Sequence, residues 1–291
     1  MAEHALSRET YQVAFDPSVP PALEIDPGDT VTFETGSDAY ERLAGGESVD
    51  VIGLPNFNRV TGPVAVRGAE PGDALAIEVL DVHVRKAFSV WLPGFGGLGG
   101  RTDEQRVMET PLEDGRAVIG DAGVSVPLRP MIGCIGTAPA EGSASTFMPA
   151  YPHGGNMDLR EMEPGTTLYL PVNVPGGLLS LGDLHAAMGT AEPTWVSLEA
   201  AGQATLRIDV APAQQLAFPR LRIAGEIYFL GIAELYPDAH ALALDQAHDY
   251  LMRERGMDAF DAYAYASACC DMRLGGPAST IVMAVLPDSD D

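Results

Sequence analysis

The residues with the most potential for chemistry lie in two short segments of the chain. His153, Asn156 and Asp158 belong to one glycine-rich stretch, and Asp183 and His185 follow it after the next predicted turn. Side chains two positions apart leave the same face of an extended strand, so we expect Asp183 and His185 to lie side by side. Carboxylate and imidazole groups together suit a divalent ion, with zinc as the first choice. The spacing therefore predicts a metal site with one open coordination position.

A water molecule at such a site needs a partner that moves its proton. A divalent cation polarises a poorly reactive carbonyl, such as that of an amide, and lowers the pKa of its bound water to roughly 7. Glu192, seven residues beyond His185, is the first candidate for the general base, and Asp38 is a second candidate for base or ligand. Asn156 suits substrate or backbone contacts better than metal binding. The competing interpretation is that these side chains have only a structural role, because Asp, Asn and His in glycine-rich turns often only make hydrogen bonds.

These side chains can meet only if the strands between them pair correctly. Residues 168–174 have the pattern of a strand, Pro175-Gly176-Gly177 that of a turn, and residues 178–181 that of the returning strand. A hairpin of this kind sets residues 183–185 opposite residues 167–169. We therefore expect the second ligand segment to lie close to the first.

The chain as a whole predicts a β-rich fold. Thirty-two Gly and 23 Pro separate short alternating segments, and acid-Pro-Gly turns precede three of them, at residues 26–28, 70–72 and 163–165. The pattern changes after residue 213, where two helices are predicted behind the candidate N-caps Asp238 and Asp258.

The predicted helices span residues 238–255 and 258–270, and a final strand spans 279–286. We therefore predict a mainly β fold with an α+β carboxy-terminal part. A β-sandwich or barrel-like body would comprise residues 1–213 and a smaller α+β subdomain residues 214–291, within one compact unit.

Composition excludes several classes of partner. Forty-one acidic and 17 basic residues give a net charge of −24, which repels phosphate backbones and anionic lipids, so we expect neither nucleic acid nor a membrane as a partner. The amino terminus lacks the basic start and apolar run of a signal peptide, so we expect a cytoplasmic location. The three cysteines form no recognisable disulfide or metal framework.

Rival catalytic arrangements have little support. Cys134 lies between apolar residues and glycines, which favours a buried, unreactive thiol over a nucleophile. The only lysine is Lys86, and no serine lies in a GxSxG or SxxK pattern. The glycine-dense segment Gly94–Gly100 lacks the features of a phosphate-binding loop, and we interpret it as a flexible loop that could act as a lid.

Several motifs, taken in order along the chain, resemble the acetamidase/formamidase family. They are Gly62-Pro63-Val64, Gly68-Ala69-Glu70-Pro71-Gly72-Asp73, His153-Gly154-Gly155-Asn156-Met157-Asp158, Leu168-Tyr169-Leu170-Pro171-Val172, Gly182-Asp183-Leu184-His185-Ala186 and Ala266-Ser267. The resemblance spans most of the chain. It implies a β-rich fold with an α+β end, a homo-oligomer for which we expect a dimer, and hydrolysis of short amides such as formamide and acetamide.

The resemblance also implies a bound divalent metal, for which we expect zinc, and it leaves room for a second ion such as calcium. Carried over residue by residue, it assigns the metal to His153, Asp158, Asp183 and His185, and acid/base chemistry to Glu192 and Asp38.

One departure from the family pattern leaves other functions open. The family often has Gln-Gly-Asp-Gly-Glu after its Gly-Asp-x-His-Ala motif, whereas this chain has Ala187-Met188-Gly189-Thr190-Ala191-Glu192. We expect Met188 to make the pocket more apolar and to alter specificity. The alternatives are a metal-stabilised binding protein without activity and a hydrolase of another C–N bond.

Overall fold

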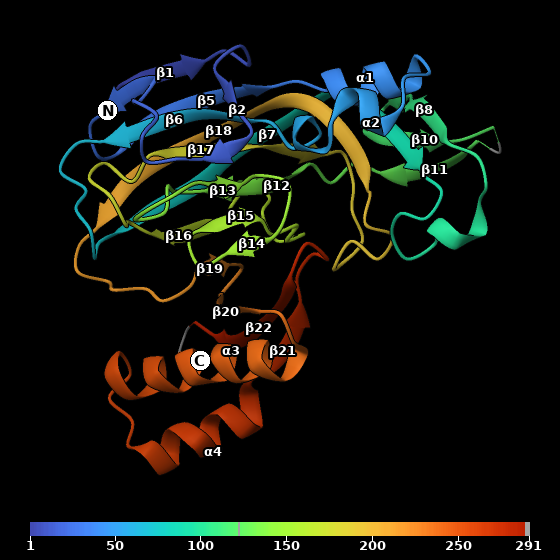
Figure 1. Cartoon of the computed structure of the whole chain (residues 1–291). Helices are drawn as coiled ribbons and strands as arrows, with labels where there is room; N and C mark the ends of the chain where they lie inside the picture. Colours follow the sequence, from blue (N-terminus) through green and yellow to red (C-terminus); the bar gives the residue numbers. More distant parts are fainter. Residues whose placement is uncertain (122, 289–291) are drawn as a thin grey trace.

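Two long antiparallel strands determine the curvature of the fold. The computed structural model describes residues 1–121 and 123–288, and in it β7 (Ala74–Trp91) pairs with β18 (Leu198–Ala211) along almost its whole length. The buried side chains of β7 alternate at Leu75, Ile77 and Val79, and after a shift in the register with β18 they alternate at Val82 and Val84. This β-bulge keeps apolar side chains on one face while the strands twist, so the sheet curls around a core (Figure 1).

The other elements before β18 are mostly short. The amino-terminal strands are β1 (Glu3–Leu6), β2 (Tyr11–Gln12), β3 (Ala14–Phe15), β4 (Leu23–Ile25), β5 (Asp29–Thr35) and β6 (Val60–Val66). Between β5 and β6 lie α1 (Asp38–Ala44), α2 (Val49–Ile52) and η1 (Leu54–Asn56). After β7 come η2 (Gly99–Arg101), β8 (Arg106–Thr110), β9 (Leu112–Glu113), β10 (Arg116–Ile119) and β11 (Val124–Pro127). The central strands are β12 (Met131–Gly136), β13 (Ala144–Ser145), β14 (Ala150–Tyr151), β15 (Gly154–Asn156), β16 (Thr167–Pro171) and β17 (Leu179–His185).

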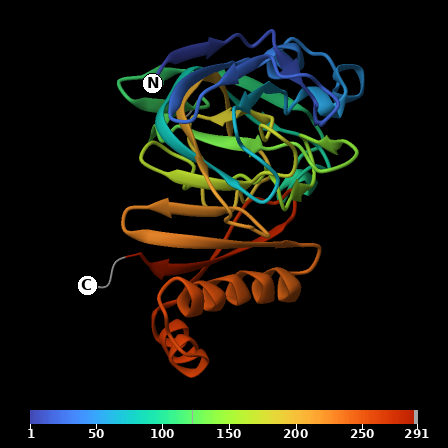
Figure 2. The same cartoon turned by 90° about the vertical axis from the view of Figure 1, so that its left-hand side faces the viewer.

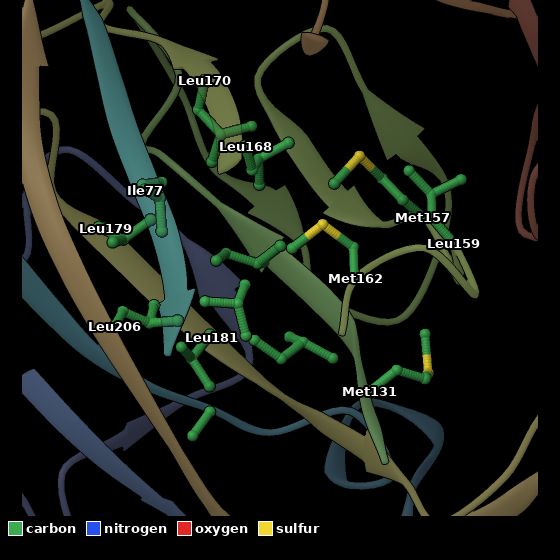
Figure 3. Close-up of a cluster of buried hydrophobic side chains, with 14 of the residues drawn as sticks. Ile77, Met131, Met157, Leu159, Met162, Leu168, Leu170, Leu179, Leu181 and Leu206 are labelled. Atoms are coloured by element: carbon green, nitrogen blue, oxygen red, sulfur yellow. The ribbon is translucent and has the colours of Figure 1, made fainter. Parts of the chain in front are cut away.

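The strand pairings form two ladders that enclose the main core. One runs β1-β5-β18-β7-β16-β19, and the other runs β4-β6-β17-β12-β15-β14. Figure 3 shows Ile77, Leu168 and Leu206 of the first ladder packed with Leu181 and Met131 of the second. The ladders join where the end of β17 pairs with the start of β18. This sandwich confirms the β-rich body predicted from the sequence.

The carboxy-terminal elements continue the first ladder. They are β19 (Arg220–Ile223), β20 (Glu226–Ala233), α3 (Tyr236–Arg253), α4 (Ala259–Cys269), β21 (Asp271–Leu274) and β22 (Thr280–Pro287). β19 pairs with β16 on one side and β20 on the other, and Figure 2 shows the long helix α3 along the outside of these strands, with α4 beyond it. The predicted α+β end is confirmed. The division at residues 213 and 214 stays a prediction.

Two local predictions about this end have different outcomes. Asp258 caps α4 and accepts hydrogen bonds from the backbone N–H groups of Phe260 and Asp261, as expected. Asp238 is not a cap, because α3 begins two residues earlier and its N-cap is Leu235. Among the described residues, no helix combines the length and the apolar character needed to cross a membrane.

The predicted hairpin of residues 168–181 is wrong. β16 pairs with β7 and β19, whereas β17 pairs with β12, β6 and β18, so the two strands lie in different ladders. Both strands are largely buried and apolar, and such a pattern does not specify which neighbour a strand takes. His185 consequently lies opposite Met131 and Glu199 rather than residues 167–169.

Candidate active site

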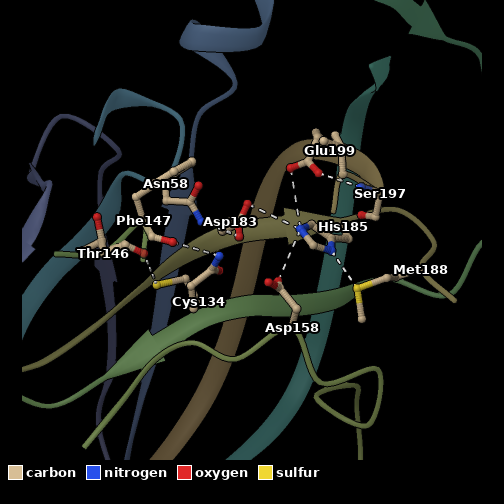
Figure 4. Close-up of polar contacts among 12 residues, drawn as sticks. Asn58, Cys134, Thr146, Phe147, Asp158, Asp183, His185, Met188, Ser197 and Glu199 are labelled. Carbon is tan, nitrogen blue, oxygen red and sulfur yellow. Dashed lines mark hydrogen bonds and ion pairs between the residues drawn. The ribbon is translucent and has the colours of Figure 1, made fainter. Parts of the chain in front are cut away.

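The candidate site lies where the two ladders join. Asp183 and His185 end β17, and His185 pairs directly with Glu199 at the start of β18. Asp158 follows β15, which is held on β12 by the pairing of Asn156 with Cys134. Because β12 lies between β15 and β17, it brings Asp158 next to Asp183 (Figure 4). Three sequence-predicted ligands thus meet.

Carboxylate oxygens converge on one imidazole nitrogen. The Nε2 atom of His185 lies 3.4 Å from Asp183 Oδ1, 3.6 Å from Glu199 Oε2 and 3.9 Å from Asp158 Oδ1. Ligand atoms of His185, Glu192 and Glu199 also lie within 4.8 Å of one another. We call Asp158, Asp183, His185, Glu192 and Glu199 the acidic cluster.

Neighbouring groups fix the orientation of this cluster. Asn58 Nδ2 donates to Asp183 Oδ2 over 2.8 Å, and the Ser197 N–H donates to Glu199 Oε1 over 2.9 Å. In each carboxylate one oxygen is therefore held by the protein and the other faces His185. His185 Nδ1 lies 3.3 Å from the sulfur of Met188. A proton on Nδ1 would point at this sulfur and leave the lone pair of Nε2 free as a ligand.

The backbone of the site departs from regular strand geometry. Asp158 has φ 45° and Asp183 has φ 55°, in the left-handed region that aspartate tolerates better than most residues. Asp183 and His185 do lie together, but Asp183 is not in the extended conformation on which that expectation rested. The carboxylates occupy the space that a Cβ at Gly133 would need. Strain of this kind is typical of functional sites.

Burial and mutual repulsion shift the pKa values of the cluster. Burial, with the charge of Asp183, raises the pKa of Asp158 well above its usual range. Burial and the charge of Asp158 raise the pKa of Glu192 to about 10, and burial raises that of Glu199 to about 7. Burial alone would lower the pKa of His185, but Glu199 and Asp183 outweigh it and raise the pKa well above 6.5. The cluster therefore favours bound protons or another cation.

Two of the sequence-predicted residues lie elsewhere. His153 stacks on Tyr151, with ring centroids 5.1 Å apart, and its backbone oxygen accepts from Thr137. Thr137 follows the end of β12, and among the described residues His153 belongs to neither group whose ligand atoms lie within 4.8 Å of one another, so it is not part of the acidic cluster. Asp38 is an exposed residue at the start of α1 that does not line the main cavity, although it lines a small neighbouring pocket together with Asp183 and Glu199.

Sequence reasoning missed three groups of the site. Glu199 is buried beside His185, Asn58 holds Asp183, and Tyr40 hydrogen-bonds Glu199. Only Glu199 left a signal, since it is an acidic residue within an otherwise uncharged stretch of β18. Asn58 and Tyr40 lie in the α1–β6 region, far along the chain from the two segments that carry the predicted ligands.

A cavity of about 520 Å³ opens over the acidic cluster. Asn156 lines it, and its buried Oδ1 has no hydrogen-bond partner, while its role in substrate binding stays a prediction. Met188 does not line this cavity, and the expectation that it makes the pocket more apolar is wrong, because the side chain lies against His185 Nδ1 instead. Cys134 is buried, and burial raises the pKa of its thiol well above 9.

Fold and site together define a β-sandwich protein with a buried, histidine-centred acidic site. The chain belongs to the Acetamidase/Formamidase family, whose pattern it matches over residues 3–147 and 140–283. The resemblance seen in the motifs is therefore confirmed.

Solved structures agree with this assignment. The acetamidase from Bacillus halodurans is 33% identical, with a TM-score of 0.91 and 97% of both chains covered. The acetamidase from Yersinia enterocolitica is 30% identical, with a TM-score of 0.87 over 98% of this chain and 92% of that one.

The formamidase of Methylophilus methylotrophus is 25% identical over 66% of this chain and 62% of its own length. The present chain thus spans less than two thirds of that protein.

The space around Gly133 gives a first prediction. A Cβ there would lie 2.6 Å from Asp158 Oδ1, 2.8 Å from the backbone oxygen of Asp183 and 2.9 Å from Asp183 Oδ2, so Gly133→Ala must displace the cluster. We expect a loss of about 1–3 kcal/mol in the free energy of unfolding, measured in urea. Gly189→Ala is the matched control, because its nearest neighbour would be Pro193 at 3.6 Å. Equal stability of the two variants would contradict the tight packing at Gly133.

The pKa of Glu192 gives a second prediction, for chelator-treated protein. The folded chain keeps this proton up to a pH of about 10, whereas the unfolded chain releases it near 4.5. Folding therefore takes up a proton, and stability falls as pH rises between these values, by at most about 1.4 kcal/mol per pH unit for one group. Glu192→Gln should flatten the slope measured by urea unfolding, and Glu113→Gln, at an exposed site, should not. A slope unchanged by Glu192→Gln would contradict this account.

Proposed function

We propose that the chain hydrolyses small carboxylic amides, formamide and acetamide among them, to carboxylate and ammonia, and that Asp158, Asp183, His185 and Glu199 hold a divalent cation. The observation that carries the proposal is the convergence of three carboxylate oxygens on Nε2 of His185 in a buried site. None of the described residues that line the cavity is Lys or Arg. Membership of the acetamidase/formamidase family supports the reaction class.

The donor set fits a divalent cation. Four carboxyl groups with little exposure repel one another, and among the described residues that line the cavity only the imidazole of His185 can carry a positive charge. Asp158 Oδ1 is buried and has no hydrogen-bond partner. Imidazole with carboxylates is a ligand set of catalytic zinc sites, and zinc remains our first choice. When bound, such a cation would polarise the amide carbonyl and lower the pKa of a coordinated water to roughly 7.

The remaining residues have separate roles in the proposed reaction. Glu192 comes from the loop after β17 and reaches the cluster from the cavity side, where it can take the proton of water and pass it to the departing nitrogen. Asn156 Oδ1 can accept a hydrogen bond from the amide N–H of the substrate. Asn58 and Ser197 keep Asp183 and Glu199 aimed at His185. His153 is left out of this ligand set because it lies apart from the cluster.

Paired substitutions test the proposal. Glu192→Gln should retain the metal, measured by elemental analysis, and lower ammonia release from acetamide by about 10²- to 10⁴-fold, because only the proton carrier is lost. Asp183→Ala should lose metal and activity together. Glu113→Gln, the same change at an exposed position, should behave as the unmodified protein.

Two results would contradict the proposal. Full activity in metal-free Asp183→Ala protein would exclude the cluster as the reactive centre. If the metal-loaded protein released no ammonia from any amide, the alternative of a metal-stabilised binding protein would be favoured instead.

A further inference from the structure

The cavity over the acidic cluster is much larger than the smallest amides. Its volume is about 520 Å³. A water molecule occupies roughly 30 Å³, so acetamide, about the size of three waters, would fill roughly a fifth of it. Pockets of roughly 300–1,000 Å³ are those that enclose much larger ligands. Acetamide alone would leave most of this cavity unused.

The walls away from the cluster are apolar and come from separate segments. The region of α1, α2 and η1 contributes Leu43, Val49, Leu54 and Phe57. The end of β7 and the loop after it contribute Val90, Leu92, Pro93 and Phe95. Further apolar residues are Phe147, Met148, Trp195, Val196, Pro277 and Ala278. Burying the hydrocarbon part of a ligand against such walls is favourable. The walls offer few hydrogen-bond partners to polar substituents.

The charges of the cavity restrict the substrate further. Its described lining residues include no Lys or Arg, and Asp50 adds an acidic group to those of the cluster. A carboxylate or phosphate on the acyl part of a substrate would find no Lys or Arg along these walls and would meet the like charge of Asp50. The lining therefore favours a substrate without charge.

The aromatic rim of the cavity is tied to the segment that carries Glu192. Phe95 packs edge-on against Trp195, with ring centroids 6.0 Å apart. Their segments lie in direct contact, because a Cβ at Gly96 would lie only 2.1 Å from the backbone oxygen of Thr194. The backbone N–H of Trp195 in turn donates to the backbone oxygen of Glu192. A group bound against Trp195 would therefore contact the same short segment that positions the proton carrier.

We infer that the preferred substrate is an uncharged primary amide with a bulky apolar acyl group, of the size of a phenyl or a branched alkyl chain, held by these apolar walls. The inference rests on the proposed amide hydrolysis at the acidic cluster. The water oxygen forms the new bond to the carbonyl carbon, the C–N bond breaks, and the nitrogen leaves with a proton from the water, which gives the carboxylic acid and ammonia.

The test is ammonia release from metal-loaded protein with acetamide, butyramide, hexanamide, benzamide and phenylacetamide. We expect kcat/KM to rise roughly fourfold for each buried methylene. A preference for acetamide over all larger amides would overturn the inference and leave the proposed function standing.

If no amide is hydrolysed, a binding measurement shows whether the proposed function alone has failed or the inferred preference for apolar amides has failed as well. In Trp91→Phe protein, which retains Trp195 as its single tryptophan, phenylacetamide should quench fluorescence at lower concentration than acetamide. Such binding without turnover would overturn the proposed function and support the apolar preference of the cavity. Absence of quenching by phenylacetamide would overturn the inference as well.

A cavity-filling variant tests the role of the walls. Leu54 lines the cavity and is 48% exposed, so Leu54→Trp can be accommodated without disturbing the core. It should lower the ratio of kcat/KM for phenylacetamide to that for acetamide at least tenfold. Leu235→Trp, at an exposed position outside the cavity, is the matched control and should keep the ratio. An unchanged ratio in Leu54→Trp protein with a normal thermal unfolding curve would contradict the inference.

Discussion

Four carboxyl groups buried around one imidazole are the interaction on which the rest of the site depends. Removing an ionised carboxylate from water costs several kcal/mol, and each neighbouring carboxylate adds repulsion. Without a cation, the protein can keep these groups only by holding protons, which is why the pKa of Glu192 rises to about 10 and that of Glu199 to about 7. A bound divalent cation would remove this penalty and convert the cluster from a destabilising feature into a stabilising one.

The fold provides this cluster by joining two ladders. His185 ends β17 and Glu199 begins β18, and their pairing is the place where the ladders meet. β12 holds the segments of Asp158 and Asp183 on either side, and Gly133 leaves the space that their carboxylates occupy. The long bulged strands β7 and β18 curl the first ladder, while the α1–β6 region supplies Asn58 and part of the apolar walls. The acidic cluster thus comes from the strands where the ladders join, whereas much of the cavity wall comes from segments outside that junction.

The sequence supported the fold class because turn residues and period-2 patterns are local signals. It also predicted that Asp158, Asp183, His185 and Glu192 would meet, since these residue types were dense in the motifs. It failed where long-range pairing decides, as in the supposed hairpin, the position of His153 and the absence of Glu199 from the ligand set. The identity of the metal, a second ion such as calcium, the dimer and the cytoplasmic location stay predictions.

Anomalous diffraction at the zinc absorption edge, on crystals grown with zinc, tests the central claim most directly. We predict a strong peak among His185 Nε2 and the facing oxygens of Asp158, Asp183 and Glu199, and no peak there in crystals soaked with a chelator. An acidic cluster without a peak, in crystals whose zinc lies elsewhere on the chain, would contradict it.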